Sequence, residues 1–218
     1  MKRERIKKLY KKIALALSLC GMIVWAVLGT GTSLAWFADT SPEVNNIFHF
    51  ADFELVVSQR QEDGSWKKVD SQTEVFDNEA LYEPGYTQVV YLKIENKGDR
   101  DFNFDTAVSV NGYVLATNVF GNRFNLQDYL LFGLSTAETE QEMDRNVPDR
   151  EAAMQIATQK LNNYYSLPNV ITLAPNEASY MTIVVRMPED VTNVANYRGD
   201  TVPQVDLGII IKAEQIKN

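Results

Sequence analysis

The chain of 218 residues is poor in the residue types that most often bind metals and perform catalysis. It has a single cysteine, Cys20, and a single histidine, His49. One histidine excludes a His-Glu-x-x-His zinc site and every other site that needs two imidazole groups. The sequence also lacks a Gly-x-Ser-x-Gly elbow, a phosphate-binding loop and a dinucleotide-binding fingerprint. These absences predict a protein that is not an enzyme and that carries no cofactor.

Basic and apolar residues at the N-terminus form the pattern of a secretion signal. Seven bases and one acid lie in the first twelve residues, and residues 13–28 are almost wholly apolar. A basic segment, an apolar segment and then small residues is the layout of a signal peptide. Ser33 and Ala35 place small residues where a signal peptidase requires them, so we predict cleavage after Ala35 and a mature chain that begins at Trp36. Residues 1–35 would then form a signal helix that is inserted in the membrane before cleavage.

Two other fates of this N-terminus can be weighed from the residues. The apolar segment is long enough to cross a hydrocarbon core, which needs about 20 apolar residues, so the signal could instead be retained as a membrane anchor. Gly29 and Gly31 weaken the end of that segment, which favours cleavage. A lipoprotein box at Cys20 is excluded because Leu19 stands where the box needs a small residue. After cleavage the chain has no cysteine, and therefore neither disulfides nor thiolate metal sites.

The predicted mature chain is strongly acidic. Residues 1–35 contain seven of the 21 bases and one of the 29 acids, so 14 bases and 28 acids remain, a formal charge of −14. This charge disfavours nucleic acids and anionic membrane surfaces as partners, and suits a solvated extracellular protein. Residues 36–218 show no internal repeat and no linker that would divide them, so we expect a single domain.

Alternating apolar and polar residues predict an all-β domain, an antiparallel β-sandwich of about seven to nine strands. Turns between the strands are predicted at Asp63-Gly64, Pro84-Gly85 and Asn111-Gly112. One short inserted helix is expected at about residues 146–165, where four apolar residues recur at helical spacing. The expected strands cover residues 47–57, 66–69, 87–95, 102–110, 129–134, 170–173, 179–187 and 205–213.

Three aspartates around one predicted turn are the candidate metal ligands of the chain. Asp99, Asp101 and Asp105 could provide an oxygen cage for calcium. The same residues, with Arg100 among them, also suit an ordinary solvated loop. The sequence leaves both interpretations open and contains no recognisable catalytic metal site.

A stretch on either side of the first predicted strand carries a family resemblance. Residues 35–40 read Ala-Trp-Phe-Ala-Asp-Thr, and residues 46–55 read Asn-Ile-Phe-His-Phe-Ala-Asp-Phe-Glu-Leu. They resemble the start of the TasA/camelysin family of exported Gram-positive proteins. The match holds at Asn46, Phe48 and Leu55, and it departs at Ala51 and Phe53, where the family prefers Gly and Leu.

The resemblance implies a jelly-roll-like sandwich, processing by a SipW-type signal peptidase and deposition outside the cell. TasA-like members form biofilm-matrix fibres, in which the N-terminal segment of one subunit completes a sheet of the next. We therefore expect a secreted cell-surface or biofilm-matrix structural protein that associates with itself and with other matrix or cell-wall components. Two rivals stay open. Camelysin is assigned as a metalloprotease, which makes a secreted protease one of them; a surface adhesin anchored by its retained signal is the other.

The candidate assembly segment lies between the predicted cut and the first strand. Trp36 and Phe37 lead it, and Asp39 and Pro42 follow. Two aromatic side chains on a free end would each forgo roughly 2 kcal/mol of burial. Pairing with a sheet edge of a neighbouring subunit would recover it, with main-chain hydrogen bonds providing affinity. The alternative is that these aromatics fold back onto their own domain.

Overall fold

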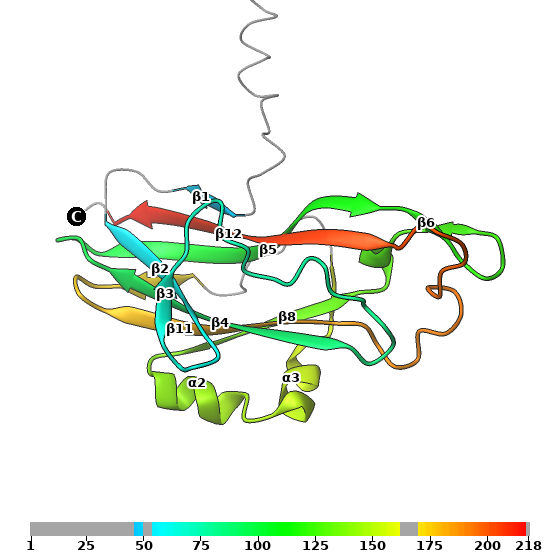
Figure 1. Cartoon of the computed structure of the whole chain (residues 1–218). Coiled ribbons are helices and arrows are strands. Elements are labelled where there is room, and N and C mark those ends of the chain that lie inside the picture. Colours follow the sequence, from blue (N-terminus) through cyan, green and yellow to red (C-terminus); the bar gives the residue numbers. More distant parts are fainter. Residues whose placement is uncertain (1–45, 50–53, 162–169, 217–218) are drawn as a thin grey trace, which may run out of the picture. The chain divides into compact units, whose positions relative to one another are not determined.

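A computed structural model of the chain describes residues 46–49, 54–161 and 170–216. These residues form two β-sheets that face each other, with two short helices on the outer side of one sheet (Figure 1). The all-β class and the antiparallel sheets predicted from the sequence are confirmed. None of the helices in the described ranges is long and apolar enough to cross a membrane. The predicted signal helix, residues 1–35, lies outside these ranges.

The first sheet has four strands and contains the N-terminal strand of the described chain. Its order is β1 (Ile47–His49), β12 (Gln204–Gln215), β5 (Phe102–Val114) and β10 (Ile171–Leu173). β1 runs parallel to β12, whereas the other neighbours are antiparallel. At about 3.3 Å per residue, β5 and β12 each extend for roughly 40 Å and form the long axis of this sheet.

The second sheet has six strands, all antiparallel to their neighbours. Its order is β3 (Trp66–Lys68), β2 (Leu55–Arg60), β4 (Thr87–Asn96), β11 (Ala178–Arg186), β8 (Leu131–Ala137) and β9 (Gln159–Lys160). A small hairpin of β6 (Ala116–Thr117) and β7 (Arg123–Phe124) and a 3-10 turn, η1 (Leu126–Asp128), connect β5 to β8.

One hydrophobic core fills the space between the sheets. Alternate residues of β4 and β11 point inward, such as Leu92 and Ile183, and neither is exposed to solvent. They meet Phe104 of β5 and Ile209 of β12 from the other sheet. Burial of every second residue is what a sheet with one face on a core requires, so the alternation seen in the sequence marks the core correctly.

The expected turn at Asn111-Gly112 is wrong, because both residues lie inside β5. Gly112 pairs with Asp206 and Val110 pairs with Leu207, so Asn111 is an extra residue in a β-bulge. Asn-Gly is a strong turn signal only when the flanking strands pair with each other. Here β5 pairs with β12, far along the chain, and this long-range pairing overrides the local preference.

The single helix expected at residues 146–165 is also corrected, because the structure has two helices in this region. α2 (Glu140–Asn146) begins at the cap residue Thr139, whose hydroxyl accepts a hydrogen bond from the Glu142 N–H at 3.2 Å. α3 (Arg150–Ile156) is capped by Asp149 in the same way. Pro148 separates the helices, because the residue before a proline is disfavoured in helical conformation. The predicted span continues past Ile156 into β9, so its end was wrong as well.

The two helices lie on the outer face of the second sheet, away from β5 and β12 (Figure 1). Val147, Ala153 and Ala157 pack against Val184 of β11 and form a second, smaller core. A Cβ atom added at Gly133 of β8 would lie 2.0 Å from the Ile156 carbonyl oxygen. Glycine at this position therefore lets the end of α3 approach the sheet.

Candidate functional site

The residues predicted for cleavage and assembly lie outside the described residues. They are Ser33, Ala35, Trp36, Phe37 and Asp39. The structure does describe Asn46, where the chain enters the fold, and the sheet edges beside it. These features are what a segment before Asn46 would meet on this side of the sheet.

Asn46 fixes the start of β1 against two other parts of the chain. Its side chain is fully buried. The amide nitrogen donates to the carbonyls of Asp70 at 2.9 Å and Thr73 at 2.7 Å, and the amide oxygen accepts from the Ile209 N–H at 3.1 Å. Its backbone N–H also donates to the Ser71 carbonyl at 3.2 Å. The side chain therefore joins the start of β1 to β12 through its oxygen and to the turn at residues 70–73 through its nitrogen.

A tight turn presents the two carbonyls that Asn46 binds. The Thr73 hydroxyl donates to the Asp70 carboxylate at 2.7 Å, and the Gln72 N–H donates to the same oxygen at 3.0 Å. These hydrogen bonds hold the pKa of Asp70 below its ordinary value. The carboxylate is ionised at neutral pH and keeps the turn closed, so the turn is preformed for Asn46.

A second asparagine covers the edge of β12 next to Asn46. The Asn78 side-chain oxygen accepts from the Leu207 N–H at 2.8 Å, and its amide nitrogen donates to the Leu207 carbonyl at 3.4 Å. Val75 and Phe76, just before it in the loop, are buried in the core, which holds this loop against the sheet. Asn78 thus occupies the backbone groups that a further strand beside β12 would need.

The described edge strands are all very short. β1, β3 and β10 have three residues each, and β9 has two. β3 and β9 also carry lysines: Lys67, Lys68 and Lys160. Short edges and edge lysines are common protections against uncontrolled pairing between sheets. These edge strands are therefore poor surfaces for uncontrolled pairing.

A hollow lined by both apolar and polar residues, with the apolar ones in the majority, opens at the end of the sandwich where β12 begins. It has a volume of about 380 Å³ and lies between the loop before β4 and the loop from β11 to β12. Leu126 and Met187, both buried, line it, whereas Leu81 and Tyr197 at its rim are 56% and 38% exposed. The Tyr82 ring also lines it, and burial raises the pKa of this phenol, which stays neutral.

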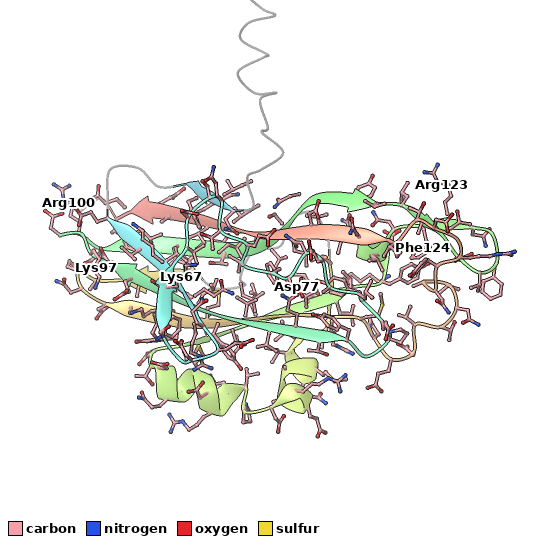
Figure 2. The ribbon with its side chains drawn as sticks, in the orientation of Figure 1. Lys67, Asp77, Lys97, Arg100, Arg123 and Phe124 are labelled. Carbon is pink, nitrogen blue, oxygen red and sulfur yellow. The ribbon has the colours of Figure 1, made fainter. Side chains whose placement is uncertain are left out.

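Exposed apolar side chains surround this end of the molecule. Tyr113 is 54% exposed and Phe120 is 64% exposed. The β6–β7 hairpin is joined to the loop before β12, because the Asn118 amide nitrogen donates to the Val194 carbonyl at 2.9 Å. Figure 2 shows Arg123 and Phe124 of β7 at this end, and Lys97 and Arg100 at the opposite end. An apolar patch on a soluble domain commonly marks an interaction site.

The candidate calcium ligands lie near the opposite end. Asp99 and Asp101 are exposed around the turn from β4 to β5, and Asp105 is half-buried within β5, where it pairs with Lys212 of β12. No group of three or more His, Cys, Asp and Glu side chains in the described ranges could hold a metal ion. His49 belongs to β1.

A group of charges on the outer face of the second sheet has a structural role. Arg60 of β2 donates to Asp144 of α2 at 2.6 Å, and its guanidinium lies 4.0 Å from the centre of the Tyr91 ring. Partial burial acts to lower the pKa of Arg60, but the hydrogen bond to Asp144 and its charge raise it overall. Arg60 therefore ties α2 to the sheet.

Sequence reasoning gave no structural role to Asn46 or Asn78 and did not find the hollow. Asn46 appeared only as one matching position of the family resemblance, and an isolated asparagine in a loop carries no pattern that could reveal Asn78. The hollow is formed by loops distant in the sequence. Comparisons with protein-family models, with curated proteins and with solved structures found no match to this chain.

Proposed function

We propose that this chain is a secreted cell-surface or matrix structural protein without enzymatic activity, and that it self-associates through its N-terminal segment. The secretion pattern of residues 1–35 and the aromatic start of the predicted mature chain support the proposal. The TasA-like resemblance of residues 35–55 adds the expectation of a jelly-roll-like strand order and of fibres. Other matrix or cell-wall components are the expected further partners.

The state of the β12 edge is the observation that carries the proposal. β1 pairs with Ile210–Lys212, Asn46 takes the Ile209 N–H, and Asn78 takes both backbone groups of Leu207. If the residues before Asn46 continued the register of β1 on β12, they would reach Leu207, whose backbone groups Asn78 already binds. The segment therefore has no continuous place in its own sheet, which favours pairing with another copy of the chain.

Deletion of residues 36–43 from the mature chain tests the proposal. We expect a β-rich monomer by circular dichroism, with little change in melting temperature, and no polymers in electron microscopy or light scattering. A matched variant with Trp36→Ser and Phe37→Ser keeps the length of the segment and should lose polymers as well. Normal polymerisation of the truncated chain would contradict the proposal, and unfolding of that chain would support fold-back of the segment instead.

Two further measurements separate the rivals. N-terminal sequencing of the extracellular protein should find Trp36 as the first residue, whereas Met1 would indicate an adhesin that keeps its anchor. Zinc-dependent cleavage of casein by the purified protein would identify a camelysin-type protease. We expect no such cleavage, with or without added zinc.

A further inference from the structure

The hollow beside the start of β12 has the chemistry of an anchor site for an aromatic side chain. Among its lining residues only Glu83 is charged, and most of the others are apolar or aromatic. Its volume of about 380 Å³ falls within the range of about 300–1,000 Å³ typical of sites for small organic groups. Buried Met187 at its base and exposed Tyr197 at its rim let a bulky ring exchange water for apolar contacts.

From these features we infer that the hollow receives the Trp36–Phe37 end of a second copy of this chain. This inference rests on the proposed function and names the acceptor surface for it. After the predicted cleavage, the chain before Asn46 has ten residues, 36–45, and it begins with these two aromatics. Extended, it spans about 33 Å, enough to leave one molecule and enter a neighbour.

The position of the hollow makes the contact head-to-tail. The donating segment leaves at Asn46, beside Ile209, whereas the hollow lies next to Pro203, roughly 20 Å away along β12. Donor and acceptor are thus different surfaces of the same molecule. Contacts between unlike surfaces are heterologous, and they continue into open filaments unless the rotation between subunits closes a ring.

Asn78 opposes pairing of the segment along its own β12 edge toward its own hollow. The direct route to Pro203 would follow the edge of β12, and Asn78 holds both backbone groups of Leu207 on that route. The segment's reach of about 33 Å also allows other routes to its own hollow, and cross-linking distinguishes these from binding to a neighbour. Binding in trans also gives each molecule one donor and one acceptor.

Substitutions at the rim test the acceptor without touching the core. Leu81→Asp introduces a charge at a side chain that is 56% exposed, so the fold should persist. We expect the concentration needed for polymers to rise about tenfold or more, as for loss of a binding hot spot. Val170→Asp is the matched control, because Val170 is 64% exposed and adjoins β10 near the opposite end of β5. An equal effect of both substitutions, or no effect of Leu81→Asp, would overturn the inference.

Cysteine cross-linking locates the segment, because the mature chain has no cysteine of its own. Ala38→Cys is combined with Asn193→Cys at the hollow or, as a control, with Lys67→Cys on the β3 edge. Disulfide ladders with Asn193→Cys alone would support the inference, and a closed monomer would overturn it in favour of binding within one molecule. Ladders with Lys67→Cys alone would place the acceptor at a sheet edge and leave the proposed function standing. Absence of polymers in the unmodified chain would refute both.

Discussion

Replacing Asn46 with alanine should strongly destabilise the fold, because this side chain makes three hydrogen bonds at a buried position. Alanine would leave the buried Ile209 N–H and the carbonyls of Asp70 and Thr73 without their partner. An unsatisfied buried group costs about 1–3 kcal/mol, and each partly buried carbonyl costs somewhat less. We expect a loss of about 3 kcal/mol in the free energy of unfolding.

Thermal unfolding of a chain that begins at Trp36, the predicted mature N-terminus, measures this loss. For a domain of this size a loss of 1 kcal/mol lowers the melting temperature by about 2–4 °C, so Asn46→Ala should melt roughly 9 °C below the parent chain. Hydrogen exchange should report the cause, since the Ile209 amide should exchange faster while amides in the middle of β11 change less.

An exposed asparagine provides the control for this prediction. Asn193 lies in the loop before β12 and its side chain is exposed, so Asn193→Ala should alter stability by no more than about 0.5 kcal/mol. A melting temperature for Asn46→Ala within about 2 °C of the parent would refute the reasoning. It would mean that β1 contributes little to the domain and that the edge of β12 is open in solution.

The remaining predictions concern packing and charge. Gly133→Ala should destabilise the domain by about 1–3 kcal/mol in urea unfolding, because the added carbon meets backbone atoms of α3. Gly112→Ala is its control and should cost less, since the added carbon meets the flexible carboxylate of Asp206. Partial burial acts to raise the pKa of Glu95, but hydrogen bonds from Lys97 and Lys93 hold it below the ordinary value. The stability from Glu95 is therefore present above its unfolded pKa of about 4.3 and is lost as the pH falls through the lower folded value. At low salt, Glu95→Gln should lower the melting temperature at pH 7 and have a smaller effect at pH 3, and an equal effect at both would contradict this.

The strands could be predicted from the sequence because burial forces their pattern. β4 and β11 each place every second residue in the core, and a one-residue shift would turn their apolar residues to solvent. The hairpin between β2 and β3 could also be predicted, since Asp63-Gly64 joins two strands that do pair. Local sequence suffices where the structure depends on neighbours along the chain.

Features that depend on distant parts of the chain could not be predicted. The bulge at Asn111 exists because β12 pairs with β5 from about a hundred residues away. The start of α2 has a capping pattern, Thr139 followed by Glu142 three residues later, but the helix has too few apolar residues to show a helical periodicity. The hollow forms where the loop before β4, η1 and the loop after β11 meet, so no single segment of the sequence predicts it.

The closed edges of this domain have a consequence for the timing of assembly. Edge strands that are short or bear lysines, and a β12 edge covered by Asn78, disfavour edge-to-edge pairing of the sandwich. Under the proposed function, the pairing element is the segment that begins at Trp36, and before cleavage this segment is continuous with the apolar signal. Its free aromatic end then exists only after the signal peptidase has acted. Polymer growth should therefore be confined to the outside of the cell. A chain that still carries residues 1–35 has the acceptor surface but no free aromatic end, so it should not donate its segment to a neighbour.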